Sequence, residues 1–175
     1  KKVTNDYYIN HFKELGKDIS AFLDTLGRNE RYIIDNNSDE NALTMALEAA
    51  KRALEAANIS PEQLDAIVYS SDTPEYLCPS NALIINHYLN AVNAHTVYDL
   101  NSNCVGMVVA LDQISRYMKT SKHIKYALVV GSVFSSSIAR PDCKYTYPTS
   151  GDGAAAVVLE CVDEPASVSY THLRA

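Results

Sequence analysis

Four short apolar runs, separated by segments with helical spacing, constrain the fold of this chain more than any other feature. Each run has the length of a buried strand and is rich in β-branched residues or alanine. The predicted strands are Ala66–Ser70, Asn93–Leu100, Tyr126–Val130, which Gly131 closes, and Gly153–Leu159. Strands that alternate with helices are typical of an α/β fold in which helices cover the faces of the sheet.

The helices are predicted from apolar stripes and from signals at their ends. Asn41–Ala57 has a stripe with many alanines, which lets a neighbouring element approach closely, and Asn81–Leu89 forms a second helix. A third helix opens at Cys104, and because it is apolar on nearly all sides we expect it to be buried. Near the start, Tyr7–Ile34 has a looser pattern that predicts short helices ending at Gly27.

Composition excludes several classes of partner. The 175 residues are 47% hydrophobic and 21% charged, which is ordinary for a globular domain, and the formal net charge is −6. A negative chain lacks the clustered Lys and Arg that bind a phosphate backbone, so no nucleic acid partner is expected. No stretch approaches the roughly 18 consecutive apolar residues of a membrane span, and residues 1–10 lack the apolar run of a secretory signal. We therefore expect a cytoplasmic protein with no membrane partner.

The cysteines are widely spaced and include no C-x-x-C pair, so neither a disulfide framework nor a metal site is predicted. Cys104 differs from the others because it follows a strand and a polar turn and opens the most apolar helix. Free backbone N–H groups at a helix start favour a thiolate and can stabilise an oxyanion, and Gly106 would leave room for a substrate carbonyl. The alternative is that Cys104 is a small buried residue of the core. The remaining cysteines are Cys78, Cys143 and Cys161, and the last two are predicted to be bystanders.

Five segments resemble landmarks of the ketoacyl-carrier-protein synthase III family, in the same order and at similar separations. Each alone is a weak signal, but together they span the chain from about Tyr7 to Glu160. The segments are Glu48-Ala-Ala-Lys-Arg-Ala-Leu54, Thr73-Pro-Glu-Tyr-Leu-Cys-Pro-Ser80, Asp99-Leu-Asn-Ser-Asn-Cys104-Val-Gly-Met107, Ala127-Leu-Val-Val-Gly-Ser132 and Ser150-Gly-Asp-Gly-Ala-Ala-Ala-Val-Val-Leu-Glu160.

The resemblance implies a thiolase-like fold, of which this chain is the amino-terminal half. That half is expected to be one α/β domain over residues 1–165, with the element order βαβαβαββ and a sheet layered with helices. The family opens with a strand ahead of the region that matches Val3–Asn5, and this strand is expected to be missing. Residues 166–175 are expected to be either the start of the second half or foreign sequence, and we expect the carboxy-terminal domain to be absent.

The resemblance also implies the chemistry. Cys104 would take an acyl group from a thioester such as acyl-coenzyme A, and a malonyl group on acyl carrier protein would then condense with it and lose carbon dioxide, as in fatty acid biosynthesis. In this family a His and an Asn of the second half activate the malonyl group, and none of the five histidines present falls at a matching position. We therefore expect no condensation turnover from this chain alone.

The substrate pocket follows from the same resemblance. Cys78, Gly106 and Met107 would line it. Cys78 stands where relatives carry a residue, usually aromatic, that reaches across a dimer interface to the floor of the partner's acyl pocket. A smaller side chain there would admit longer or branched acyl chains, although Cys78 could equally be an ordinary loop cysteine.

Coenzyme A is expected as part of the substrate, with no cofactor bound. Where relatives clamp its adenine with a Trp and an Arg, this chain has Ala21 and Thr25, and Arg28 or Arg31 could substitute. The family also implies a homodimer, in which Tyr126–Val130 would lie near the shared sheet.

Gly151-Asp152-Gly153 lacks the lysine and the helix start of a phosphate loop, so we interpret it as a tight turn with glycines at positive φ and Asp152 as its cap. Two other functions stay open. One is a different thiolase-fold acyltransferase, such as one like hydroxymethylglutaryl-coenzyme A synthase, or a relative that makes esters or amides. The other is a non-catalytic interaction subunit.

Overall fold

The computed structural model of the protein describes residues 1–35 and 37–162 and divides into two units. The small unit comprises Lys1–Asn41 and Val133–Gly153, and the sheet unit comprises Ala42–Ser132 and the chain from Ala154 onward. The predicted boundary between residues 165 and 166 lies outside the described residues. No helix in the described ranges is both long and apolar enough to cross a membrane.

The sheet unit contains four strands in the order β4-β3-β5-β6. Strand β3 runs parallel to both β4 and β5, with Ser70 opposite Leu100 on one side and opposite Gly131 on the other. Long connections between parallel neighbours are what a helix-covered sheet requires. The strands are β3 (Ala66–Ser70), β4 (Thr96–Leu100), β5 (Tyr126–Val133) and β6 (Gly153–Glu160). All four predicted strands are thus confirmed, with small shifts at their ends.

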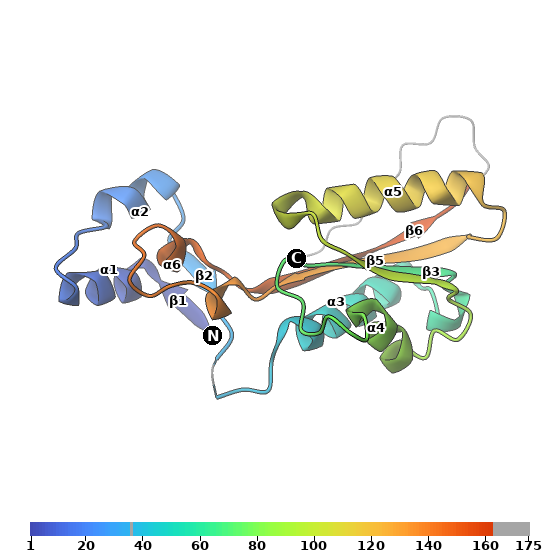
Figure 1. Cartoon of the computed structure of the whole chain (residues 1–175), viewed down its shortest axis with the longest axis horizontal. Coiled ribbons are helices and arrows are strands. Elements are labelled where there is room, and N and C mark those ends of the chain that lie inside the picture. Colours follow the sequence, from blue (N-terminus) through green and yellow to red (C-terminus); the bar gives the residue numbers. More distant parts are fainter. Residues whose placement is uncertain (36, 163–175) are drawn as a thin grey trace. The chain divides into compact units, whose positions relative to one another are not determined.

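Helices cover both faces of this sheet, as Figure 1 shows: α5 lies on one face, and α3 and α4 lie on the other. The alternation of side chains along β3 explains why both faces are covered. Ile67 and Tyr69 pack in the cluster that includes α3 and α4, whereas Ala66 and Val68 pack in the cluster under α5. The helices are α3 (Ala42–Ala57), α4 (Asn81–Leu89) and α5 (Gly106–Thr120), with short 3-10 turns η1 (Pro61–Gln63), η2 (Asn103–Val105) and η3 (Ser135–Ser137).

Helix α5 differs from its prediction, because it is buried on one side only. Gly106, Ala110, Ile114 and Met118 recur every four residues and face the sheet, while Val108 is 68% exposed. The prediction of a helix buried all round is therefore wrong for the described residues. The prediction relied on apolar density alone, whereas the buried residues follow the i, i+4 interval and the other apolar side chains lie outside that stripe.

Strand β5 also runs further than predicted, because it passes through Gly131 to Val133. A Cβ atom at Gly131 would lie 2.5 Å from the Sδ atom of Met107 on α5. The glycine therefore allows helix and strand to approach each other and does not end the strand.

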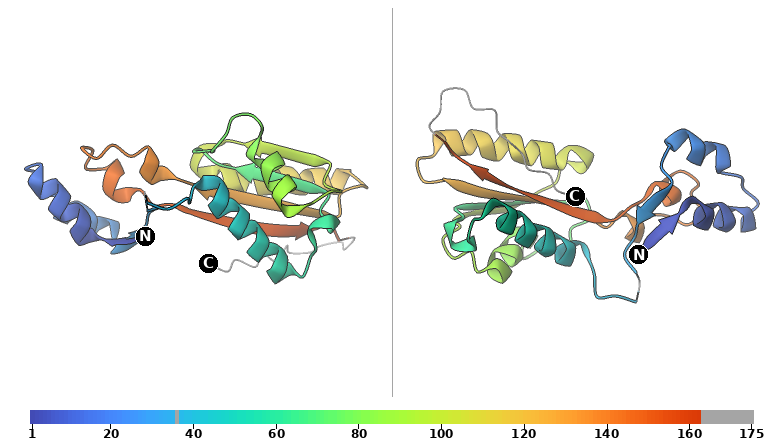
Figure 2. Two further views of the ribbon diagram at one scale, coloured as in Figure 1. Left: turned by 90° about the horizontal axis from the view of Figure 1, so that it is seen from below. Right: turned by 180° about the vertical axis from the view of Figure 1, so that it is seen from behind.

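The small unit contains an antiparallel sheet and short helices (Figure 2). Gly27 has φ +65° and ends α2, as the sequence predicted. A separate apolar cluster, which includes Tyr8, Phe12 and Leu23, holds this unit together. Its elements are β1 (Lys2–Thr4), β2 (Glu30–Tyr32), α1 (Asn5–Glu14), α2 (Ser20–Leu26) and α6 (Thr146–Thr149).

Asp152 joins two segments of the small unit that are distant in sequence. Its carboxylate accepts hydrogen bonds from the Ile34 N–H at 2.8 Å, the Ser136 N–H at 2.9 Å and the Ser136 hydroxyl at 2.5 Å. The structural role of Asp152 is confirmed. The turn around it was interpreted wrongly, because the glycines at positive φ are Gly16 and Gly27, and neither Gly151 nor Gly153 is among them.

Candidate active site

Cys104 lies in the 3-10 turn η2, between the end of β4 and the start of α5. The Asn101 side chain shapes this turn by accepting the Asn103 N–H at 3.0 Å, and Asn103 itself has φ +51°. The predicted order of strand, turn and helix is confirmed, although α5 begins two residues after the cysteine. Cys104 is exposed, so the alternative that it fills the core is wrong for this structure.

The start of α5 has no side-chain cap, because Val105 stands at the N-cap position and makes no side-chain hydrogen bond there. The first N–H groups of a helix have no partner within the helix and carry partial positive charge. An uncapped helix start next to an exposed thiol therefore places partial positive charge near the sulfur, although the Gly106 N–H itself donates to the Asn103 carbonyl.

Gly106 and Met107, predicted to line the substrate pocket, both pack toward the sheet. Gly106 is buried, and a Cβ atom there would collide with the hydroxyl of Ser70 at the end of β3. The space beside Gly106 is therefore filled by β3 and is not open to a substrate carbonyl. The Met107 side chain lies over Gly131 of β5.

Cys78 is exposed and lies in the loop that connects β3 to α4. Its neighbour Leu77 is 94% exposed, so apolar surface gathers at the tip of this loop. The loop leaves the sheet at the same end as the Cys104 turn, because Ser70 and Leu100 are paired and the Ser71 N–H donates to the Leu100 carbonyl at 3.3 Å. Ligand sites in α/β proteins gather at this carboxyl end of parallel strands.

Of the two arginines considered for coenzyme A, the structure leaves one accessible. Arg31 is only 4% exposed, its guanidinium lies 4.7 Å from the centre of the Tyr8 ring, and it donates to the Asn5 side chain at 2.7 Å. Arg31 is therefore buried in the small unit and cannot bind an adenine at the surface. Arg28 is exposed and donates to the Thr149 carbonyl at 2.6 Å.

Cys143 was predicted to be a bystander, but its surroundings set it apart. Hydrogen bonds from Thr146 and from the backbone at Tyr145, together with the charge of Arg140, lower the pKa of the Cys143 thiol. It lines a surface hollow of about 430 Å³ with Lys17 and Lys144 among its neighbours. The basic residues nearby in sequence were only a partial signal, because the charge of Arg140 is the smallest of these causes. Cys143 is thus a second thiol that can compete with Cys104 for an electrophile.

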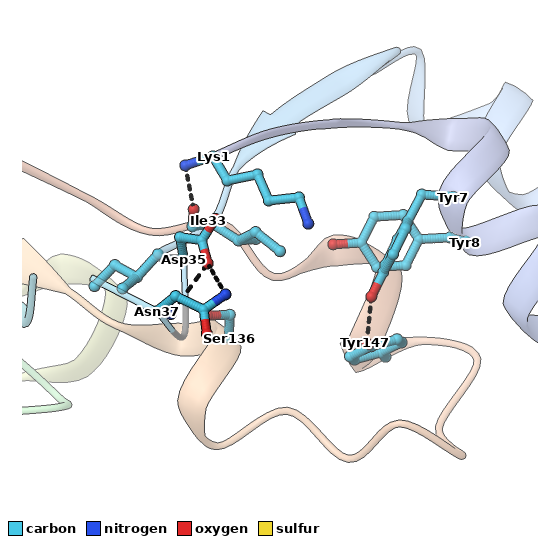
Figure 3. A pocket seen from close by; sticks show the side chains of 9 residues that line it. Lys1, Tyr7, Tyr8, Ile33, Asp35, Asn37, Ser136 and Tyr147 are labelled. Atoms are coloured by element: carbon cyan, nitrogen blue, oxygen red, sulfur yellow. Dashed lines mark hydrogen bonds between the residues drawn. The ribbon is translucent and has the colours of Figure 1, made fainter. Parts of the chain in front are cut away.

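A second hollow of the small unit has a volume of about 240 Å³ and is lined by three tyrosines (Figure 3). The hydroxyls of Tyr7 and Tyr147 lie 3.3 Å apart. Burial, reinforced by the neighbouring Tyr7 hydroxyl, raises the pKa of Tyr147 to about 12. Tyr147 therefore keeps its proton to a higher pH in the folded protein than in the unfolded chain, where a tyrosine titrates near pH 10.

This pKa difference predicts a loss of stability in alkali. The favourable term is fully present below about pH 10 and is lost as the pH rises toward 12, because the unfolded chain then releases a proton that the folded chain keeps. We expect Tyr147→Phe to reduce the fall in unfolding free energy between pH 9 and pH 11, as measured by urea denaturation. Tyr145→Phe is the control, since Tyr145 is 58% exposed. Equal pH slopes in all three proteins would contradict the prediction.

The sequence of this chain is similar to a known protein family and to several of its members. Residues 98–175, which include Cys104 and Gly106, match the family model for 3-oxoacyl-[acyl-carrier-protein (ACP)] synthase III. The chain is 36% identical over 140 residues to the β-ketoacyl-[acyl-carrier-protein] synthase III of Coxiella burnetii, covering 80% of this chain and 43% of that protein. It is 36% identical over 156 residues to the enzyme of the same name from Clostridium acetobutylicum, covering 85% and 46%.

The fold shows the same similarity. The crystal structure of 3-oxoacyl-[acyl-carrier-protein] synthase III from Aquifex aeolicus superposes with a TM-score of 0.82 at 30% identity, covering 94% of this chain and 51% of that one. The chain thus spans about half the length of the relatives that it matches.

Proposed function

Because this chain belongs to the 3-oxoacyl-[acyl-carrier-protein] synthase III family of thiolase-fold condensing enzymes, we propose that Cys104 accepts an acyl group from an acyl-coenzyme A thioester. The observation that carries the proposal is the position of an exposed thiol in the 3-10 turn before an uncapped helix. The stretch of this chain that the family model matches, residues 98–175, includes this turn.

In the proposed first step, the Cys104 thiolate attacks the carbonyl carbon of the thioester. The tetrahedral intermediate carries its negative charge on oxygen, and N–H groups at the start of α5 are suited to stabilise that charge. Collapse of the intermediate breaks the bond to coenzyme A, whose thiolate leaves and takes up a proton. The product is an acyl thioester on Cys104.

In the proposed second step, which belongs to the whole enzyme, malonyl acyl carrier protein loses carbon dioxide and its carbanion attacks the acyl carbonyl. A new carbon–carbon bond forms, and Cys104 is released as the leaving group. The family resemblance assigns activation of the malonyl group to a His and an Asn of the second half. The reaction is a decarboxylating Claisen condensation in fatty acid biosynthesis.

A homodimer is also proposed, on the resemblance alone. Strand β5, which contains Tyr126–Val130, is flanked by β3 and β6 within the chain. Among the described strands of this sheet, β4 and β6 stand at the edges. An unpaired edge is where a strand of another chain can add.

The acyl transfer is tested by incubating the folded chain with acetyl-coenzyme A and measuring its intact mass. We expect a gain of one acetyl group, and we expect malonyl acyl carrier protein to discharge it when the chain is extended to the length of its relatives. A folded chain that gains no acetyl group, and whose Cys104 does not react with iodoacetamide, would contradict the proposal and favour a non-catalytic interaction subunit.

A further inference from the structure

Asn81, the first residue of α4, is completely buried, although it is polar and follows a surface loop. Both the nitrogen and the oxygen of its side-chain amide make hydrogen bonds. The Nδ2 atom donates to the Tyr76 carbonyl at 2.7 Å and to the Asp99 carboxylate at 2.9 Å, and the Oδ1 atom accepts the Tyr76 N–H at 3.2 Å. Asn81 therefore pairs with both backbone groups of Tyr76, as a neighbouring strand would.

Asp99 lies on β4 and completes the network. Its two carboxylate oxygens accept the backbone N–H groups of Asn81 and Ala82, each at 2.7 Å. These are the first N–H groups of α4, which have no partner within the helix. Bonds from N–H groups to a carboxylate are strengthened by its charge. The start of α4 is thus fastened to β4 by a residue that is distant in sequence.

This network connects the two loops that carry the candidate site. Cys78 lies inside the short segment from Tyr76 to Asn81 that the amide closes, and Cys104 follows Asp99 by one short turn. The pairing of Ser70 with Leu100 brings the two loops out at the same end of the sheet. Loss of the network would free the Cys78 loop at the end of the sheet where the Cys104 turn also lies.

We propose that Asn81 and Asp99 are positioning residues that hold the Cys78 loop in place and thereby set which acyl chains the Cys104 site accepts. The inference rests on the proposed function in its second part only. Its first part, that the amide of Asn81 holds the loop, depends on the hydrogen bonds alone.

The test uses Asn81→Ala, with Asn93→Ala as the matched control. Asn93 is exposed and also donates to a backbone carbonyl, that of Glu62 at 2.7 Å, but it lies at the far end of α4. In Asn81→Ala we expect hydrogen exchange at the Tyr76 amide to become about tenfold faster, which is the effect expected from the loss of one hydrogen bond. Exchange in β3 and β5 should stay unchanged. A residue with only a general structural role would speed exchange throughout the sheet unit.

The second readout is selectivity. We expect the ratio of Cys104 acylation rates with acetyl-coenzyme A and octanoyl-coenzyme A to change by about threefold or more in Asn81→Ala, and to stay constant in Asn93→Ala. If Asn81→Ala fails to fold, Asn81→Ser serves, because its hydroxyl is too short to pair with both groups of Tyr76.

Unchanged exchange at Tyr76 in a folded Asn81 variant would overturn the inference. Faster exchange with an unchanged rate ratio would overturn its selectivity part. A chain that forms no acyl adduct before any substitution contradicts the proposed function and selectivity with it, whereas the exchange measurement still decides whether Asn81 holds the loop.

Discussion

Cys104→Ala is expected to abolish acylation of the chain by acetyl-coenzyme A while leaving its stability almost unchanged. The sulfur is the proposed acyl acceptor, so no other atom of the turn can form the thioester. The side chain is exposed, and substitutions at such positions change the free energy of unfolding by about 0.5 kcal/mol or less. Intact mass and urea denaturation measure the two effects on one sample.

Cys161→Ala is the matched control for this substitution. Cys161 is partly buried, and its thiol lies 3.7 Å from the Met118 carbonyl, so its loss tests whether removing any thiol alters the result. The control should acylate like the unchanged chain. An acyl adduct that persists in Cys104→Ala would show that another cysteine is the acceptor.

Gly106→Val is expected to have the largest effect on stability, a loss of about 3 kcal/mol, as overpacking of a filled core can cost. The helix start is buried against β3, and the first carbon of any side chain would overlap the Ser70 hydroxyl. The free energy of unfolding in urea measures the loss. Part of it should be restored by adding Ser70→Ala, because that change removes the colliding atom.

Gly153→Val provides the comparison for Gly106→Val. A Cβ atom at Gly153 meets no other atom within 4 Å, and the residue begins β6, where valine is favoured. We expect this variant to be as stable as the unchanged chain. If both variants lose a similar amount of unfolding free energy, the close approach of α5 and β3 does not explain the need for glycine at position 106.

The strands and most helices could be predicted because local pattern determines them. Ala66–Ser70 and Asn81–Leu89 match their predicted bounds, since each has a clear apolar run and a clear end signal such as Ser80 at the N-cap. Gly27 ends α2 through a positive φ, which a glycine adopts at no steric cost. Such features need no knowledge of what packs against them.

The errors lie where a residue's role depends on a distant partner. Gly131 was predicted to end β5 but makes room for Met107, and Gly106 faces Ser70 instead of a substrate. Both contacts join segments more than twenty residues apart, which no local pattern reveals. The prediction that α5 is buried on all sides failed for the same reason, because the burial of a helix depends on what covers each of its faces.

The candidate site shows the same division. The turn-to-helix position of Cys104 could be predicted from its neighbours, whereas the role of Asn81 could not, because Tyr76 and Asp99 meet it only in the folded chain. Cys143 was missed because the hydrogen bonds that lower the pKa of its thiol arise from the fold of the segment around Thr146.

The most direct test of the central claim is to map the acylated cysteine after a limited reaction with acetyl-coenzyme A. The folded chain would be digested and the peptides of all four cysteines compared by mass spectrometry. The account predicts that the acetyl group lies on the peptide that contains Cys104. An acetyl group found mainly on Cys143 or Cys78, with Cys104 unmodified, would contradict it.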